Sequence, residues 1–317
     1  DTQDAAAAVP TDRKDFAFLS CGTWSLLGTE LERPLINETT QTLNLTNEGG
    51  FGGTTTLLNN IIGLWLIQES RRQWQREGKN YSFADMEKMA LESPPLKCFI
   101  DPDFPDLSTA GDIPNRIRAY CKKTGQEVPE TDGEVVRCIY ESLALKYDWT
   151  LKRLEQSTGK KYDTLYIVGG GTKDGLLCKM AADCLNINVS AGPIEATVLG
   201  NAAIQLITLG EIADISQARD IIRKTEQIKH FAPDAEQARA FEEKKKISIA
   251  DYKSNQKNAG KVAIFDFAHS FLVAEGDRGS DWMELELLCE ELRKNGDFRI
   301  VIVPTSILFG FDYIRSM

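Results

Sequence analysis

Hydrophobic positions in the first part of the chain form two patterns that predict different elements. Residues 16–28 are two short apolar runs on either side of Gly22-Thr23, which predicts a strand, a tight turn and a second strand. Residues 55–78 carry apolar side chains at helical spacing, and Gly78 suits the C-terminal cap of a helix. We therefore predict a β-hairpin followed by a helix.

A second helix is predicted in the middle of the chain. Thr131 and Glu134 have the spacing of a capping box, and the apolar positions that follow keep helical periodicity to about Glu155. Gly159 lies just beyond this periodic stretch and is suited to close it.

The most informative local sequence contains three consecutive glycines. Residues 163–168 predict a buried strand, Gly169–Gly171 a turn, and the following residues a helix that runs to about Asp183. A short strand at 186–190 and a helix at 196–209 follow. Strands that alternate with helices in this order predict an α/β fold.

The character of the sequence changes after Pro233. We divide the chain into a domain at 1–235, a charged linker at 236–260 and a βαβ-like extension at 261–317. In the extension, apolar runs at 262–267 and 298–303 predict strands on either side of a helix over 281–295.

Composition excludes several classes of function. The chain has 37 basic and 47 acidic residues, a net charge of -10, which argues against general binding to nucleic acid or anionic membranes. No apolar run approaches the length of a membrane span. The seven cysteines include no CxxC pair, and two histidines are too few for most zinc sites or for Ser-His-Asp catalysis. We expect a cytoplasmic protein and, because the first residue is Asp1, a piece of a longer chain.

Two glycine turns are candidates for anion binding. Glycine allows the backbone of Gly169–Gly171 to approach a phosphate, and the following helix offers free N–H groups, but such a turn also serves tight packing. The spacing and the missing acidic residue do not fit a dinucleotide fingerprint. The Gly22-Thr23 turn can also be interpreted in two ways: it contacts a phosphate, or it only forms the turn between the strands.

Polar residues in the apolar stretch 55–78 are a third candidate. Asn60 and Gln68 are eight positions apart, so on one helix they would lie within about a quarter turn of each other. Such amides either cap neighbouring loops or contact a ligand. Asp1 and Asp4 are carboxylates of possible catalytic use, and spacing does not choose between them.

Four separated segments, 18–28, 60–74, 137–147 and 167–172, closely resemble the rhamnulokinase group of the FGGY sugar-kinase family. The resemblance runs from Asp1 to about Ala235. It implies an actin-like fold with two ribonuclease-H-like domains and ATP between them, of which this chain resembles only the C-terminal domain. The resemblance therefore implies that the N-terminal kinase domain is missing, and residues 247–317 resemble nothing in the family.

The resemblance also implies roles for residues on the sugar side. Asp1 and Thr2 match the family's Asp-Thr segment, in which the aspartate is the general base on the sugar hydroxyl. Asn60 matches an asparagine that contacts the sugar. Asp1 is therefore the expected catalytic residue, with Asp1, Thr2 and Asn60 binding the substrate.

On the nucleotide side, the resemblance implies that Thr23 contacts the ATP phosphates, that Gln68 lies near the nucleotide and that Gly170 borders the adenosine. The cofactors expected are ATP and Mg2+, with the ion on ATP oxygens and no protein metal site. Cys121 and Cys138 match a family pair that can form a disulfide, although reduced thiols are our expectation.

The function implied is ATP-dependent phosphorylation of L-rhamnulose to L-rhamnulose 1-phosphate, in L-rhamnose catabolism. The expected partners are this sugar, ATP and the missing N-terminal domain, with no nucleic acid or membrane. Other ketoses such as fuculose or xylulose remain open, and so does a non-catalytic actin-like nucleotide-binding or assembly module. We expect the 317-residue chain alone to be inactive, because the transfer needs both domains.

Overall fold

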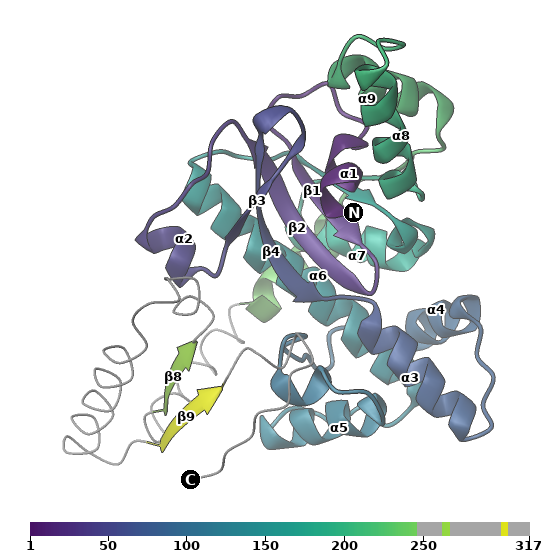
Figure 1. Cartoon of the computed structure of the whole chain (residues 1–317). Coiled ribbons are helices and arrows are strands. Elements are labelled where there is room, and N and C mark those ends of the chain that lie inside the picture. Colours follow the sequence, from purple (N-terminus) through teal and green to yellow (C-terminus); the bar gives the residue numbers. More distant parts are fainter. Residues whose placement is uncertain (246–261, 267–298, 304–317) are drawn as a thin grey trace. The chain divides into compact units, whose positions relative to one another are not determined.

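A seven-stranded mixed sheet organises the first of two compact units in the computed structural model (Figure 1). The structure describes residues 1–245, 262–266 and 299–303. The first unit comprises Asp1–Lys244 and the second Lys245–Met317.

The sheet has an antiparallel half and a parallel centre, in the order β3-β4-β2-β1-β5-β6-β7. The first four strands pair antiparallel, β1 pairs parallel with β5, β5 pairs parallel with β6, and β7 closes the other edge antiparallel. The strands are β1 (Ala17–Cys21), β2 (Trp24–Leu31), β3 (Thr46–Gly49), β4 (Thr55–Ile62), β5 (Thr164–Val168), β6 (Asn188–Ala191) and β7 (Lys229–Phe231). Parallel pairing of β1 with β5 brings together two turns that are far apart in the sequence.

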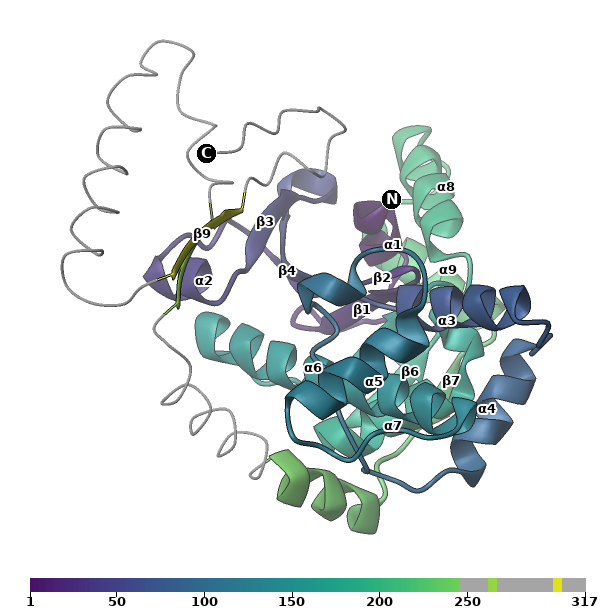
Figure 2. The same ribbon diagram turned by 90° about the horizontal axis from the view of Figure 1, so that it is seen from below.

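The long central helix α6 (Asp132–Thr158) and the shorter helix α7 (Gly175–Leu185) pack on one face of the sheet, and three further helices pack around α6, as Figure 2 shows from below. Tyr140, Tyr147 and Trp74 are fully enclosed there and are among the largest side chains of the core. The three further helices are α3 (Trp65–Arg76), α4 (Phe83–Glu92) and α5 (Ile113–Lys123). The short elements α2 (Glu38–Thr42), η1 (Phe51–Gly53), η2 (Pro105–Leu107) and η3 (Gly170–Lys173) lie in the connections.

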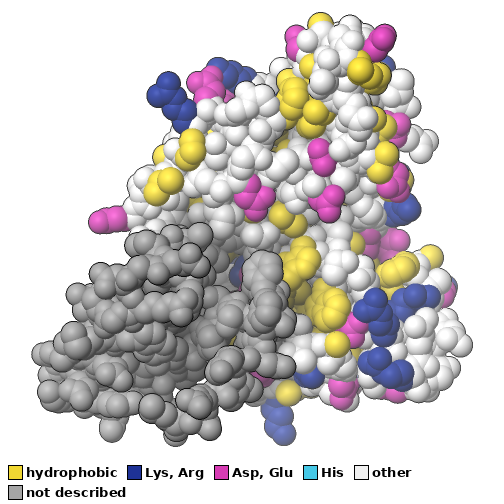
Figure 3. Space-filling model, viewed as in Figure 1, with side chains coloured by type: hydrophobic (Ala, Val, Ile, Leu, Met, Phe, Trp, Pro, Cys, Tyr) yellow, Lys and Arg dark blue, Asp and Glu magenta, His cyan; other side chains and the backbone are white. Residues whose placement is uncertain are grey.

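The opposite face carries α1 (Thr2–Ala7), α8 (Ala196–Thr208) and α9 (Ile215–Thr225) over a smaller core. Gly200 lets α8 approach the backbone of α1 closely, because a methyl carbon added there would lie 2.6 Å from the carbonyl carbon of Asp4. The outer side of α8 exposes Val198, Leu206 and Leu209, and hydrophobic side chains gather around α8 and α9 in Figure 3. Gly200 thus lets α8 pack directly against the backbone of α1, while the outer side of α8 exposes apolar side chains.

Most of the predicted elements are confirmed. The hairpin at 16–28 is β1 and β2, and the capping box of Thr131 and Glu134 starts α6, which ends at Thr158 with Gly159 at its cap in the left-handed conformation. The strand, glycine turn and helix around Gly169–Gly171 are β5, η3 and α7. The α/β fold class is that predicted from the alternation.

The helix predicted over 55–78 is wrong in its first half. Residues 55–62 form β4, and the helix α3 starts only at Trp65. β4 is covered on both faces, so its apolar residues do not alternate, and a short apolar run of this kind cannot be told from a helix by periodicity. Gly78 does follow the helix, with φ of 84°.

The boundary predicted at 235 falls at the start of a further helix. Residues 235–245 are helical, and Ala238 and Phe241 are buried against the first unit, which continues to Lys244. In the second unit, β8 (Val262–Asp266) pairs parallel with β9 (Arg299–Val303), where strands were expected. The helix predicted at 281–295 lies outside the described residues.

Candidate functional site

The Gly22-Thr23 turn joins β1 to β2 and contacts the start of α3. The carbonyl of Gly22 accepts a hydrogen bond from the Leu64 amide at 3.0 Å, and that of Thr23 accepts from the Trp65 amide at 3.1 Å. These bonds fix the start of α3 to the turn. The Thr23 hydroxyl donates to Oε1 of Gln68 on α3 over 3.4 Å, so these two side chains lie together.

The triple-glycine loop lies beside this turn, at the end of the parallel strand β5. Gly169 has φ of 91°, a conformation that favours glycine. A methyl carbon at Gly171 would lie 2.8 Å from Cβ of Cys21 and overlap its sulfur. Gly170 is exposed and has open space where a side chain would project. The loop therefore packs tightly against the end of β1 at two glycines and opens outward at the third.

The thiol behind the loop is not an ionised nucleophile. Burial raises the pKa of the Cys21 thiol to about 11, so it is protonated at neutral pH. Burial also raises the pKa of Asp174, which caps α7 by accepting the Leu177 amide at 2.9 Å. What the loop offers to a ligand is backbone N–H groups, since the first ones of η3 lie outside its own hydrogen bonds. Such groups suit an anion.

Asn60 lies on the face of the sheet that carries α1. It pairs with Leu26 of β2, and its side chain is exposed. Side chains at every second position of a strand share a face. Thr56, four positions earlier on β4, donates to Oε1 of Gln3 on α1 at 2.5 Å. Asn60 and α1 therefore belong to the same side of the sheet.

Asp1 and Thr2 lie at the start of α1. Asp1 is the N-cap residue with a fully exposed side chain, and its carbonyl accepts the Thr197 hydroxyl at 3.4 Å. The other end of α1 is held by the buried guanidinium of Arg219, which donates to the carbonyls of Ala6 and Ala7 at 3.1 and 3.2 Å. An arginine at the C-terminus of a helix also opposes its dipole favourably.

Arg219 was missed in the sequence because it contacts α1 across more than 200 positions. It also pairs with Glu30 on β2 at 2.8 Å and lies over the ring of Phe16. Its signal in the sequence is only one charge on an amphipathic helix. Asp174 was missed too, although the pattern of an aspartate before Gly175 at a helix start could have been read as a cap.

The predicted site residues thus form two groups. The first group is Thr23 and Gly170, just beyond the ends of β1 and β5, with Gln68 of α3 hydrogen bonded to Thr23. The second group lies on the α1 face of the sheet and comprises Asp1, Thr2 and Asn60. Within residues 1–245, Thr23 and Gln68 are the only pair among these six that share a hydrogen bond. The expected placement of Asn60 and Gln68 on one helix is wrong, because the first is on β4 and the second on α3.

Cys121 and Cys138 are buried free thiols, so the disulfide that the resemblance implies is not formed in the structure. Their sulfurs lie within 4.8 Å of each other and of the sulfur of Cys98. The pair is close in space as the resemblance leads one to expect.

A surface pocket lies away from both groups. It has a volume of about 590 Å³ and is lined by residues such as Asp12, Thr164 and His230, near the starts of β5 and β6. None of the predicted site residues line it. In the part of the chain that the structure describes, no helix has both the length and the apolar character required to cross a membrane.

Comparison with known proteins places these residues in a family. Residues 17–209 match the C-terminal domain of the FGGY family of carbohydrate kinases. The rhamnulokinase of Bacteroides thetaiotaomicron is 42% identical over 233 residues, which are 74% of this chain and 47% of the relative. That of Enterococcus faecalis is 42% identical over 225 residues, 70% of this chain and 45% of the relative. The chain spans about half the length of these curated relatives.

Solved structures agree on the fold. A xylulose kinase from Rhodospirillum rubrum superimposes with a TM-score of 0.59 at 17% identity, covering 81% of this chain and 51% of that one. A glycerol kinase from Plasmodium falciparum, solved with ADP, gives a TM-score of 0.52 at 14% identity, covering 82% and 50%. At these identities the likeness concerns the fold alone.

Proposed function

Because this chain belongs to the FGGY family of carbohydrate kinases and contains its C-terminal domain, we propose that it is the C-terminal half of an ATP-dependent rhamnulokinase. Relatives that are 42% identical over most of the chain are rhamnulokinases, which supports L-rhamnulose as the sugar. Half of the relatives' length has no counterpart here, so the activity belongs to this domain together with an N-terminal one.

The observation that carries this proposal is the pairing of β1 with β5. It puts the Gly22-Thr23 turn beside the triple-glycine loop at one end of the sheet. Hydroxyl and backbone N–H donors from two turns can hold the phosphates of one nucleotide. The open space at Gly170 admits close approach of the adenosine, and Gln68 is held next to Thr23. These residues fit ATP.

The sugar is proposed to bind on the α1 face of the sheet, where Asn60 and Thr2 contact its hydroxyls. Asp1 has an exposed carboxylate at the free end of α1, and Arg219 holds the other end of that helix. A sugar hydroxyl is a weak nucleophile, so a carboxylate within hydrogen-bond reach accepts its proton as the phosphoryl group is transferred.

Most of the barrier reduction in such a transfer comes from positioning the two substrates. Mg2+ bound to ATP oxygens supplies charge neutralisation. The residues of this domain orient the nucleotide through Thr23 and the glycine loop, and Asp1 takes the proton from the 1-hydroxyl of the sugar. The isolated chain can bind one substrate at each group of residues but cannot enclose both.

A fusion tests the proposal. The N-terminal half of the Bacteroides thetaiotaomicron rhamnulokinase is joined upstream of Asp1, and ADP release is measured with L-rhamnulose, L-fuculose, D-xylulose and glycerol in turn. We expect ATP-dependent 1-phosphorylation of L-rhamnulose by the fusion and negligible turnover by the isolated chain. A fusion that prefers another ketose would reassign the substrate, and an isolated chain with ordinary kinase rates would refute the half-enzyme proposal.

The base is tested in the same fusion with a matched pair of variants. Asp1→Asn keeps the shape of the side chain but removes its basicity, so kcat should fall by roughly two to four powers of ten while KM for ATP stays near its original value. Asp4→Asn makes the same change three residues later on α1 and should keep most of kcat. If Asp4→Asn is the more damaging of the two, the base is Asp4.

A further inference from the structure

Three cysteines from three separate elements converge in the core of the first unit. Cys98 lies in the loop between α4 and α5, Cys121 in the last turns of α5 and Cys138 in the second turn of α6. Their side chains are 2%, 0% and 3% exposed, and the three sulfurs all lie within 4.8 Å of one another. None of them contacts the residues proposed for the kinase site.

The loop that carries Cys98 is fixed to α6 on both sides of the cysteine. The amide of Leu96 donates to both carboxylate oxygens of Glu141 at 2.9 and 3.0 Å. The amide of Ile100 donates to the hydroxyl of Ser142 at 3.0 Å. With its backbone tied two residues before and two residues after, Cys98 has little freedom to turn away from the other thiols.

The same loop is fixed to the end of α5. The side chain of Gln126 accepts from the Phe99 amide and donates to the Phe99 carbonyl, each at 2.8 Å. The amide of Gln126 in turn donates to the carbonyl of Cys121 at 2.9 Å. One glutamine thus ties the neighbour of Cys98 to the backbone of Cys121.

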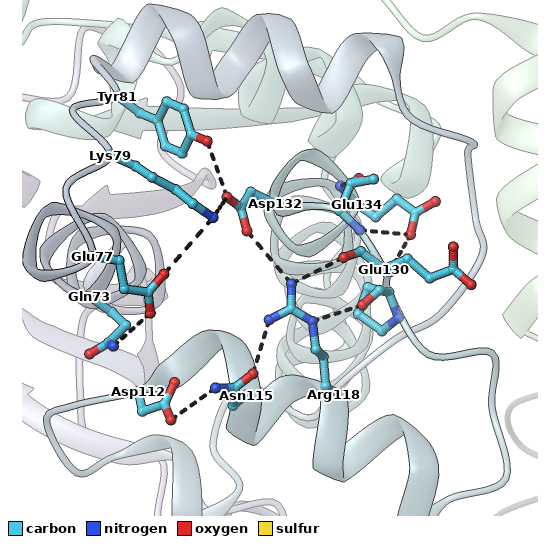
Figure 4. A network of polar contacts seen from close by, with 12 residues as sticks. Gln73, Glu77, Lys79, Tyr81, Asp112, Asn115, Arg118, Glu130, Asp132 and Glu134 are labelled. Carbon is cyan, nitrogen blue, oxygen red and sulfur yellow. Dashed lines mark hydrogen bonds and ion pairs between the residues drawn. The ribbon is translucent and has the colours of Figure 1, made fainter.

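A polar network fixes α5 against the start of α6 (Figure 4). Arg118 on α5 donates to the carbonyls of Pro129 and Glu130 at 2.9 and 3.4 Å and lies 3.6 Å from the carboxylate of Asp132. Lys79 and Tyr81 bind the same Asp132 at 2.7 and 3.2 Å. The spacing between Cys121 and Cys138 is therefore set by the scaffold on both sides.

The sulfur spacing suits a thiolate-bound cation. With metal–sulfur bonds of about 2.3 Å, sulfurs around a three-coordinate ion lie roughly 4.0 Å apart. The three thiols lie within 4.8 Å of one another, so small side-chain rotations bring them to bonding distance. In the described part of the chain no histidine or carboxylate completes a fourth position of this cluster. Zinc in structural sites takes four ligands, whereas soft thiolate sets also select Cu(I).

We propose that Cys98, Cys121 and Cys138 form a buried three-coordinate site for Cu(I). A disulfide between Cys121 and Cys138 removes two of the three ligands, so bound Cu(I) and that disulfide exclude each other. The site is independent of the sugar-kinase proposal, and its test uses the chain without any substrate.

The full chain is prepared reduced and without oxygen, then equilibrated with Cu(I) buffered by a chromogenic chelator, and X-ray absorption counts the sulfur neighbours. We expect one ion per chain held by three sulfurs. Loss of an outer-shell partner costs about 10–100-fold in metal affinity, so Cys98→Ser, which removes a ligand, should weaken binding by at least about 100-fold. Cys98→Ala is measured as well, with circular dichroism to verify that both variants fold.

Cys184→Ser is the matched control, because Cys184 is equally buried but outside the cluster, and it should bind Cu(I) like the unmodified chain. Three results would overturn the proposal. One is equal Cu(I) affinity with and without the Cys98 sulfur. A second is four-coordinate binding of Zn2+ with higher affinity than Cu(I). The third is a disulfide between Cys121 and Cys138 that persists under reducing conditions.

Discussion

Replacing Gly200 by alanine tests how closely α1 must pack on α8. The added methyl carbon would lie 2.6 Å from the carbonyl carbon of Asp4 and closer still to its oxygen. Normal carbon contacts are about 3.5–4.0 Å, and the Asp4 oxygen would lie only 1.8 Å away, so the two helix backbones have to separate by about 1–2 Å. Both contacting groups are backbone, and no flexible side chain can turn aside.

The magnitude follows from two opposing effects. Overpacking of this kind costs about 3 kcal/mol at the upper end of its usual range, and the gain in helix propensity of alanine over glycine returns about 1 kcal/mol. We expect Gly200→Ala to lower the free energy of unfolding by about 2 kcal/mol. For a unit of this size that lowers Tm by about 4–8 °C.

The assay is urea and thermal unfolding followed by tryptophan fluorescence, since Trp24, Trp65, Trp74 and Trp149 lie in the first unit. Gly175→Ala is the control, because at the start of α7 the new methyl carbon would meet its nearest atom at 3.6 Å, an ordinary contact. That variant should be as stable as the unmodified chain or slightly more so. A Gly200→Ala chain that unfolds at the unmodified midpoint would refute the reasoning.

Three further predictions concern stability. Burial raises the folded-state pKa of Asp174, so its contribution to stability is complete below its ordinary pKa and is lost as pH rises through the raised value. The Tm of Asp174→Asn minus that of the unmodified chain should therefore be higher at about pH 7 than at about pH 4.5. The same Tm difference at both pH values would contradict the raised pKa. Arg219→Met removes the guanidinium that donates to Glu30 and to the carbonyls of Ala6 and Ala7. It should cost about 2 kcal/mol in urea unfolding, whereas Arg219→Lys should recover part of that loss. Phe241→Ala should lower the unfolding free energy of the first unit by about 3 kcal/mol, because the ring is buried. Truncation after Lys245 should leave the Tm of that unit unchanged. If truncation lowers the Tm and Phe241→Ala does not, the unit ends before the helix at 235–245.

Elements whose ends are marked by particular residues could be predicted from the sequence alone. The capping box at Thr131 and the glycine at 159 mark both ends of α6, and three glycines mark the turn after β5. The strand β4 carries no such mark. Burial on both faces removed its alternation, and only pairing with β2 and β3, which the sequence does not display, makes it a strand.

The candidate site, too, could be predicted from the sequence only in part. The two glycine turns could be recognised as anion-binding candidates from residue type alone, but their adjacency depends on parallel pairing between β1 and β5. The support of α1 by Arg219 depends on a contact that joins opposite ends of the unit. Convergence of Cys98 with the other two thiols depends on a loop whose backbone amides donate to side chains of α6. Such long-range contacts have no local signature.

The pairing of β1 with β5 also has a consequence for synthesis on the ribosome. β1 ends at Cys21 and β5 begins at Thr164, so at about 5–20 residues per second the intervening chain takes roughly 7–30 s to make. During that interval the hairpin of β1 and β2 can form, but the other edge of β1 has no strand to pair with. An apolar edge left open in this way is a template for association with other chains. The nascent chain therefore spends this interval with its central strand half paired, and we expect it to be most exposed to association with other chains during that time.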